Sequence, residues 1–396
     1  MRHPASPSHL PPAGARARRK PPGPGRPSWR PGRRARGAVA AVLVALAGCG
    51  GHARHGGSLA GACPDPVVVQ TDWFPGPEYG ALYQLIGARG RVEQGAYRGP
   101  LGDSGVRLEI RPGGTALAGD SVAARMYQDP AILLGSVSTD ESVRDSGELP
   151  TVGVVSPLDR SPRVLLWDPR QFRFRTVADI GRSQASVVHP EGDATMEVLA
   201  HRRSLRRGQL DPSFDGSPVR FTTEQSIVQE GTLTNEPFVY EHELPDWHRP
   251  VGFLLVDQSG FRPYPALAVR SRTLATEADC LARLVPRIQR AQVDYLADPA
   301  PVDARLREIA GQFAALWTVS PAAVADGVRK LRALQVASNG PNRTVGDFDQ
   351  ARVARVVRDA APAFRTPEVD PVKPRLTAAE VATNRFVDPR IGLPGG

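Results

Sequence analysis

Short apolar runs alternate with amphipathic stretches from residue 66 onward. The runs Pro66–Thr71, Val106–Ile110 and Ala131–Leu134 are rich in Val, Ile and Leu, which predicts buried strands. Between them, Glu78–Ile86 and Ser121–Tyr127 place apolar side chains at three- and four-residue steps, which predicts helices. Strands and helices in this order predict an α/β fold with a parallel sheet and right-handed crossovers.

A second, smaller α/β unit is predicted inside the first. Arg163–Trp167 and Ala266–Val269 are apolar runs far apart in the chain, and we expect each to carry the chain between two lobes. The segments that lie between them are the helical stretch Ala194–Arg203 and the apolar runs Ala185–Val188, Val219–Thr222 and Val251–Val256.

The chain becomes helical from Glu277 onward. Four segments place Leu, Val and Ile at helical spacing: Glu277–Leu296, Val302–Phe313, Ala322–Leu334 and Val345–Ala360. Their polar faces mix both charges, which favours helices that pack on a core over helices that lie on a membrane. We expect the Pro-rich tail from Pro362 to Gly396 to wrap the surface.

The N-terminal region has the pattern of an export leader. Residues 1–36 are rich in Pro, Arg and Gly, and residues 37–48 form an uncharged apolar run that is too short to cross a bilayer. The run ends in Leu46-Ala47-Gly48-Cys49, which resembles the cleavage box of bacterial lipoproteins. The resemblance implies a signal peptide over 1–48, a lipidated Cys49, a flexible tether over 49–62 and a protein held at the outer face of the cell membrane. Ordinary secretory cleavage, with Cys49 incidental, is the alternative.

The net charge of +9 does not indicate a nucleic-acid partner. Ten of the 50 Lys and Arg residues, and none of the acidic ones, lie in residues 1–48, which leaves 40 basic against 41 acidic residues. Binding to a phosphate backbone needs a clustered positive face, and this balance gives no sign of one. Cys63 and Cys280 remain as a possible disulfide in an oxidising compartment, or as two unrelated buried thiols.

The segment that follows the first strand resembles the start of solute-binding proteins of ABC transporters. The matching residues run Val67-Val-Val-Gln-Thr-Asp-Trp-Phe-Pro-Gly-Pro-Glu-Tyr-Gly-Ala-Leu-Tyr83, and Thr234-Asn235-Glu236-Pro237 matches a second element. The branch that it resembles is the thiamine-pyrimidine-precursor branch of the nitrate/sulfonate/taurine-binding group, although Tyr79 stands where that branch usually has His.

The resemblance implies a type II periplasmic-binding fold, with two lobes joined by two crossover segments and the ligand cleft between them. Residues 66–155 and 264–396 would form lobe one, and residues 160–260 lobe two. Cys63 and Cys280 would then both belong to lobe one, which would allow a bridge.

Polar and aromatic residues follow the predicted strands, where clefts of α/β sheets lie. Trp73 and Tyr79 can stack on a planar ring, and Glu78, Asn235 and Glu236 can pair with ring N–H or amino groups. The full set of predicted ligand-binding residues is Asp72, Trp73, Glu78, Tyr79, Ser138, Thr139, Asp193, Thr195, Asn235, Glu236 and Tyr264. The set indicates a small heteroaromatic solute such as a pyrimidine, captured by hinge closure and passed to a permease and its ATPase. Binding of a sulfonate, nitrate or taurine is the alternative.

No enzyme motif accompanies this pattern. A Gly-x-Ser-x-Gly elbow, a His-Glu-x-x-His site and a phosphate-binding Gly loop are absent from the sequence. His242 and His248 flank two acidic residues, but Pro245 interrupts any helix there, which argues against a metal site. We therefore expect a monomeric binding protein without catalytic residues, cofactor or metal. A sensory lipoprotein and a pyrimidine-synthesising enzyme on the same fold are the remaining alternatives.

Overall fold

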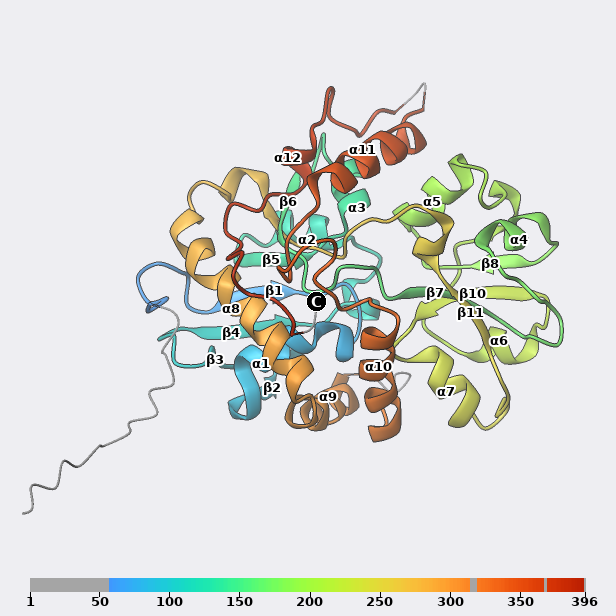
Figure 1. The fold of residues 1–396 in the computed structure, drawn as a ribbon, viewed down its shortest axis with the longest axis horizontal. Coiled ribbons are helices and arrows are strands. Elements are labelled where there is room, and N and C mark those ends of the chain that lie inside the picture. The colour runs from blue at the N-terminus through green and yellow to red at the C-terminus, as the bar shows by residue number, and fades with distance from the viewer. Residues whose placement is uncertain (1–56, 314–318, 367–368, 395–396) are drawn as a thin grey trace, which may run out of the picture. The chain divides into compact units, whose positions relative to one another are not determined.

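The computed structural model describes residues 57–313, 319–366 and 369–394. The leader, Cys49 and most of the tether lie outside the described residues. The described chain contains two β-sheets, each covered by helices, and we call the parts built on the seven-stranded and five-stranded sheets lobe one and lobe two (Figure 1).

The sheet of lobe one is mixed. Its strands, in spatial order, are β2 (Arg91–Glu93), β3 (Ala96–Pro100), β4 (Arg107–Arg111), β1 (Val67–Gln70), β5 (Ile132–Ser136), β12 (Leu267–Arg270) and β6 (Thr151–Val155). The β1 strand pairs in parallel with β4 and β5, as the β-α-β-α-β order predicts, whereas β12 runs antiparallel to β5 and β6. The antiparallel β2–β3 hairpin at the edge was not predicted.

Lobe one holds most of the helices. They are α1 (Gly80–Ile86), α2 (Val122–Gln128), α3 (Thr139–Arg144), α8 (Ala278–Ala297), α9 (Ala300–Phe313), α10 (Pro321–Ala333), α11 (Gln350–Phe364) and α12 (Ala378–Val381), with 3-10 turns η1 (Pro77–Tyr79), η2 (Gly87–Arg89), η3 (Gly114–Leu117) and η6 (Ser271–Thr273). The α8 helix buries Leu281, Leu284, Ile288 and Tyr295 on one face, which is the amphipathic spacing seen in the sequence.

Two predictions for the C-terminal region need correction. The helix predicted to begin at Val345 begins at Gln350, because the Asp349 carboxylate accepts the Ala351 and Arg352 N–H groups and caps it. The tail does not merely wrap the surface. Val381 and Ala382 are fully buried, and Ala382 bridges to Gly153 of β6, so the tail completes the packing of lobe one.

Lobe two is a sheet between two helix layers. Its strands, in spatial order, are β11 (Gly252–Leu255), β7 (Arg163–Trp167), β10 (Ile227–Thr232), β8 (Ser186–Val188) and β9 (Leu210–Asp211). Its helices are α4 (Val177–Arg182), α5 (Ala194–His201), α6 (Val219–Thr223) and α7 (Glu236–His242), with turns η4 (Arg207–Gln209) and η5 (Val256–Ser259). Helices α4 and α5 cover one side of the sheet, and α6 and α7 the other (Figure 1). The apolar run at Val219 is a short helix, and the strand beside it is β10.

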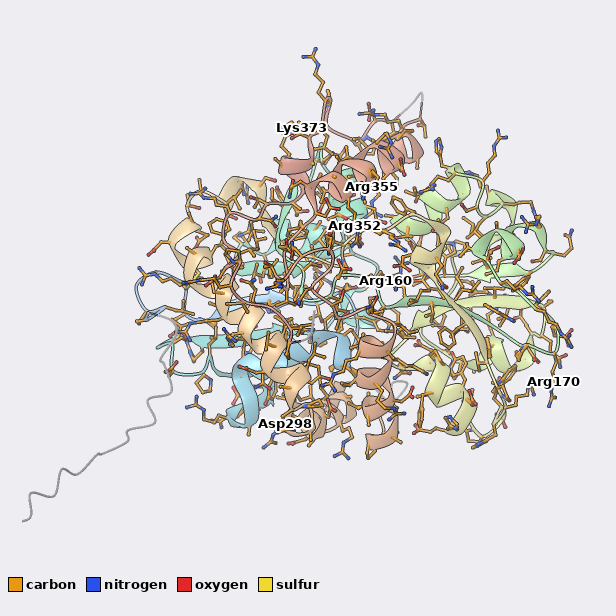
Figure 2. All side chains as sticks on the ribbon, viewed as in Figure 1. Arg160, Arg170, Asp298, Arg352, Arg355 and Lys373 are labelled. Atoms are coloured by element: carbon orange, nitrogen blue, oxygen red, sulfur yellow. A yellow bond between two sulfur atoms is a disulfide. The ribbon has the colours of Figure 1, made fainter. Side chains whose placement is uncertain are left out.

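The chain passes between the lobes at residues 156–162 and again at residues 256–266. Arg163–Trp167 and Ala266–Val269, which we expected to carry it, lie mainly in the two sheets instead. The Arg160 guanidinium on the first crossover donates to both Asp257 oxygens on the second, at 2.5 and 2.7 Å. Arg352 of α11 pairs with Asp159 and donates to the Arg262 carbonyl, so it contacts both crossovers (Figure 2). These contacts couple the two crossovers.

Candidate ligand-binding site

The loop after β1 begins the candidate site. Tight packing fixes it, because Gly113 lies directly against the Asp72 backbone and its N–H donates to the Trp73 carbonyl at 3.0 Å. The Tyr79 hydroxyl donates to Asp72 Oδ1 at 2.9 Å. The sequence prediction that Asp72, Trp73 and Tyr79 gather after the first strand agrees with these positions.

Asp72 is accessible to solvent and yet enclosed by protein. The residue is exposed, but burial among surrounding atoms raises the pKa of its carboxyl, although the Tyr79 hydroxyl and the Arg163 charge oppose that rise. Asp72 is therefore an exposed acid whose carboxylate accepts the Tyr79 hydroxyl.

Glu78 and Glu236 lie at the seam where the lobes meet. Glu78 belongs to lobe one, and its Oε2 accepts the hydroxyl of Thr234 from lobe two at 2.6 Å. Glu236 Oε2 accepts the Thr232 N–H at 2.7 Å, and its buried Oε1 has no hydrogen-bond partner among the described residues. Burial raises the pKa of Glu78 to about 7 and that of Glu236 to about 8, and the charge of Glu78 adds to the rise at Glu236.

Both carboxyl groups rest against glycines that leave room for them. A side chain at Gly76 would lie 2.5 Å from the Glu78 oxygens, and one at Gly231 would lie 3.0 Å from the Glu236 carboxyl carbon. The backbone therefore approaches both acids closely. Asn235, the residue before Glu236, is the N-cap position of α7.

A second polar group surrounds Arg163 at the start of β7. The Arg163 guanidinium donates to Glu230 Oε1 at 2.6 Å and to Thr195 Oγ1 at 3.0 Å, and it pairs with Asp193. The Thr195 hydroxyl in turn donates to Asp140 Oδ2 at 2.6 Å, and this bond joins α5 of lobe two to α3 of lobe one. Three carboxylates, those of Glu230, Asp193 and Asp140, therefore lie around the single cation Arg163.

Two predicted helix starts are occupied by their own caps. The Asp193 carboxylate accepts the Met196 N–H at the start of α5, and Ser138 and Glu141 form a capping box at the start of α3. The Ser138 hydroxyl also lies 2.5 Å from Asp140 Oδ1. Side chains of the protein itself accept N–H groups at the starts of both helices, so fewer N–H donors remain for an anionic solute than the sequence predicted.

Thr139 and Tyr264 are interior residues. Their backbones are linked by the Thr139 N–H and the Tyr264 carbonyl at 3.0 Å, and the Thr139 hydroxyl accepts the Tyr264 N–H at 2.9 Å. The Tyr264 ring is 1% exposed and lies against Phe348 and the Arg352 guanidinium. Both residues hold the second crossover against α3.

Aromatic rings close one side of the seam. Trp73 of lobe one stacks on Phe214 of lobe two, with ring centroids 6.2 Å apart and planes 19° apart, and it meets Phe74 edge-on. Sequence reasoning missed Phe214, Arg163, Asp140, Glu230 and Thr234. A charged residue that opens an apolar run, as Arg163 does after Pro162, is the sequence feature that could have indicated one of them.

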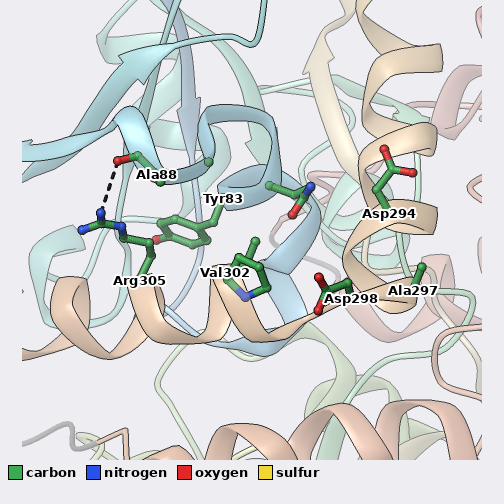
Figure 3. Close-up of a pocket in the computed structure, with 10 residues that line it drawn as sticks. Tyr83, Ala88, Asp294, Ala297, Asp298, Val302 and Arg305 are labelled. Atoms are coloured by element: carbon green, nitrogen blue, oxygen red, sulfur yellow. Dashed lines mark hydrogen bonds between the residues drawn. The ribbon is translucent and has the colours of Figure 1, made fainter. Parts of the chain in front are cut away.

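A cavity of about 330 Å³ lies elsewhere in lobe one, between α1, α8 and α9 (Figure 3). Tyr83, Asp294, Asp298 and Arg305 help to line it, and the Arg305 guanidinium donates to the Ala88 carbonyl. All its lining residues belong to one lobe, so closure of the two lobes cannot enclose a ligand there. The seam is therefore the candidate site.

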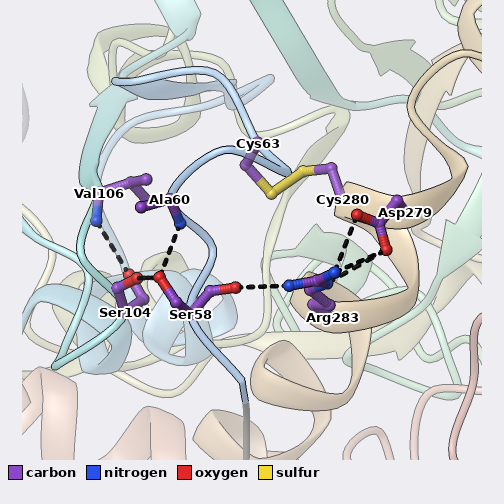
Figure 4. The surroundings of a disulfide bond; sticks show 8 residues. All are labelled: Ser58, Ala60, Cys63, Ser104, Val106, Asp279, Cys280 and Arg283. Carbon is purple, nitrogen blue, oxygen red and sulfur yellow. Dashed lines mark hydrogen bonds and ion pairs between the residues drawn. A yellow bond between two sulfur atoms is a disulfide. The ribbon is translucent and has the colours of Figure 1, made fainter.

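A disulfide joins Cys63 to Cys280 at the start of α8, with the Cα atoms 4.7 Å apart (Figure 4). Beside it, the Arg283 guanidinium donates to the Ser58 carbonyl at 2.9 Å and to the Asp279 carboxylate. The bridge and these bonds attach the segment before β1 to lobe one.

The described residues contain neither a cluster of metal ligands nor a helix that could span a membrane. No three His, Cys, Asp or Glu side chains there are grouped so that they could hold a metal ion. None of the helices described combines the length and the apolar character needed to cross a bilayer.

The two lobes, the paired crossovers and the intervening seam define a type II periplasmic-binding fold. Two solved structures share it at 12% identity. The periplasmic aliphatic sulphonate binding protein from Escherichia coli matches with a TM-score of 0.52, over 84% of this chain and 95% of that chain. The alkanesulfonate-binding protein from Xanthomonas axonopodis pv. citri, bound to MOPS, matches with a TM-score of 0.54, over 81% and 99%. No protein-family model and no curated protein matches the chain. At this identity the likeness establishes the fold alone.

Proposed function

We propose that this chain is the extracytoplasmic solute-binding component of an ABC importer. The observation that carries the proposal is the polar seam, in which Glu78 meets Thr234 and Asp140 meets Thr195 across the lobes. Such contacts stabilise a closed form, and a solute that touches both lobes would shift the hinge toward that form. A permease with its ATPase would then recognise the closed protein.

The proposed solute is a small, planar and weakly basic heteroaromatic molecule such as a pyrimidine. Trp73 stacks on Phe214 across the lobes, so a planar molecule that replaces this contact would meet an aromatic face on Trp73. Asp72, Glu78, Asn235 and Glu236 would receive its amino and ring N–H groups, and Tyr79, Ser138, Asp193 and Thr195 would complete the polar wall. The unpartnered Glu236 Oε1 is the acceptor that such a donor would satisfy.

Binding of an alkanesulfonate is the second candidate, because the two similar solved structures are sulfonate-binding proteins. Arg163 is the cation that would receive the sulfonate. Asp193 and Glu230 already pair with it, however, and further carboxylates surround it. A sulfonate would have to displace these partners, so the charge of the seam favours a solute that carries donors.

A ligand screen tests the solute class. We expect pyrimidines to raise the melting temperature of the purified protein, and alkanesulfonates and nitrate to leave it unchanged. Stacking of a base-like ring contributes roughly 1–3 kcal/mol, so Trp73→Ala should weaken binding by about fivefold or more. Phe238→Ala, which removes a partly buried ring of α7, is the control and should bind normally. Stabilisation by sulfonates instead would contradict the solute class, and stabilisation by no solute would contradict a binding function.

Lipidation of Cys49 has its own test. We propose that Cys49 carries the lipid that holds the protein at the outer face of the membrane, because the residues before it resemble a lipoprotein cleavage box. The Cys49→Ser variant should appear in the soluble fraction, whereas Gly51→Ser, which alters the tether and keeps the thiol, should stay with the membrane. Equal membrane association of the two variants would show that Cys49 is not the anchor.

A further inference from the structure

The two sides of lobe two carry opposite charge. Residues 169–210, which include α4 and α5, contain eight Arg and four acidic residues, whereas residues 211–246, which include α6 and α7, contain one Arg and eight acidic residues, of which Glu230 and Glu236 are buried in the seam. The two helix layers lie on opposite sides of the sheet (Figure 1). Residues 49–396 are nearly neutral overall, but the side of lobe two that carries α4 and α5 is basic.

The arginines of residues 169–210 are exposed, and most lack a partner. Arg170, Arg173, Arg175, Arg203 and Arg207 are exposed, and none of their side chains has an ion pair or hydrogen bond among the described residues. The remaining three are also exposed: Arg182 pairs with Asp179, Arg202 pairs with Asp359, and Arg206 donates to backbone carbonyls. Five guanidinium groups are thus available to an external anion.

Four of the five exposed, unpaired arginines lie around α4. Two of them, Arg173 and Arg175, precede α4, which has six residues and is therefore about 9 Å long. Arg203 and Arg207 lie beside the other end of α4, because the Arg206 guanidinium between them donates to the Gly181 and Ser183 carbonyls. We call this surface the α4 basic face, made of Arg173, Arg175, Arg203 and Arg207. Arg170 is not part of it, because Figure 2 shows Arg170 on the α6 side of the strands and the neighbouring Gln171 amide donates to Gln225 Oε1.

The loop that carries Arg173 and Arg175 is held in place. Phe172 and Phe174 alternate with the arginines and stack with ring centroids 4.9 Å apart, and both pack against the core under α4. The Trp167 indole N–H also donates to the Phe172 carbonyl at 3.1 Å. Because the loop is ordered before it meets a partner, binding costs less conformational entropy.

We infer that the α4 basic face docks on an anionic phospholipid bilayer. Guanidinium groups bind phosphate with paired N–H donors, and each basic residue near an anionic surface contributes to attraction. The large exposed hydrophobic residues among those described are Val219 and Val369, neither of which belongs to this face, so the contact is electrostatic and does not insert into the bilayer. Together with the proposed lipid anchor, the face would orient lobe two on the membrane. The biological setting rests on the proposed export, but the contact itself does not depend on a solute.

Vesicle sedimentation tests the inference with protein that begins at His55, because residues from His55 form one compact unit and carry no acyl chain. We expect binding to vesicles with roughly a third phosphatidylglycerol and none to phosphatidylcholine alone, with loss of binding near 1 M salt, where the screening length is about 3 Å. Arg173→Glu/Arg175→Glu and Arg203→Glu/Arg207→Glu should each lower the partition coefficient by about tenfold or more.

The control is Arg307→Glu/Arg343→Glu, which makes the same change in net charge at two exposed, unpaired arginines of lobe one. It should change binding by less than about twofold, because charges beyond a screening length contribute little. Equal losses in the control and the face variants would overturn the inference, since net charge alone would explain them. Absence of binding to anionic vesicles would also overturn it and would leave an acidic protein surface as the alternative partner. Unchanged melting temperatures of the variants exclude misfolding.

Discussion

The protein is expected to lose stability as the pH rises from about 5 to about 8, and Glu236→Gln is expected to remove much of that loss. The pKa values of Glu78 and Glu236 lie at about 7 and about 8, above the ordinary value of 4.5, chiefly because both carboxyls are buried. Between the ordinary and the raised pKa, the folded state holds protons that the unfolded state has released. Stability therefore falls through this window, at roughly 1.4 kcal/mol per group and pH unit.

The measurement is denaturant unfolding at a series of pH values, with wild type and variant compared. A glutamine at position 236 keeps an oxygen acceptor for the Thr232 N–H and cannot ionise, so it isolates the charge. Glu241→Gln changes an acid on the same helix and serves as the control. A pH profile of Glu236→Gln that matches wild type would show that the buried carboxyl does not control stability in this range.

The double variant Cys63→Ser/Cys280→Ser is expected to lower the free energy of unfolding by about 3–5 kcal/mol. The disulfide closes a loop of 217 residues, and a bridge across a long loop removes much conformational freedom from the unfolded chain. It also attaches the segment before β1 to α8, whose Cys280 is fully buried. Chemical denaturation of the oxidised protein and the variant gives the difference.

Two comparisons separate the bridge from the effect of substitution. Wild-type protein treated with reductant should match the double variant in stability, and Cys63→Ala/Cys280→Ala should match both if the added hydroxyls are harmless. Non-reducing mass spectrometry of the protein that begins at His55 should find no free thiol. Two free thiols, together with unchanged stability of the variants, would exclude a structural role for the pair.

The spacing of apolar residues predicted the strands and helices that bury one face regularly. The three strands that were predicted before residue 140 and the helices α8, α9 and α10 lie within a few residues of their predicted bounds, because burial on one face leaves a regular apolar spacing. Prediction failed where spacing was ambiguous. Val219–Thr222 has the apolar content of a strand but forms α6, and the neighbouring β10 was missed because it carries Gln229 and Glu230 among its apolar residues.

Part of the candidate site could also be predicted from the sequence. Asp72, Trp73, Glu78 and Tyr79 follow one strand, so their proximity is a local property. Arg163, Phe214 and Glu230 joined the site unpredicted, because their roles depend on which segments of lobe two face lobe one. The same holds for the α4 basic face, because in the sum over residues 49–396 its charges cancel against acids elsewhere in the chain.

The sequence by itself determined the two-lobed α/β class and the acidic, aromatic character of the loop after the first strand, since both follow from short-range spacing and residue chemistry. Tertiary structure alone decided that Glu78 meets Thr234 across 156 positions, that one buried Glu236 oxygen has no hydrogen-bond partner among the described residues, and that four exposed arginines of lobe two lie around α4. Side chains far apart in the chain meet only when the packing of both sheets fixes their positions, and no local pattern records that packing.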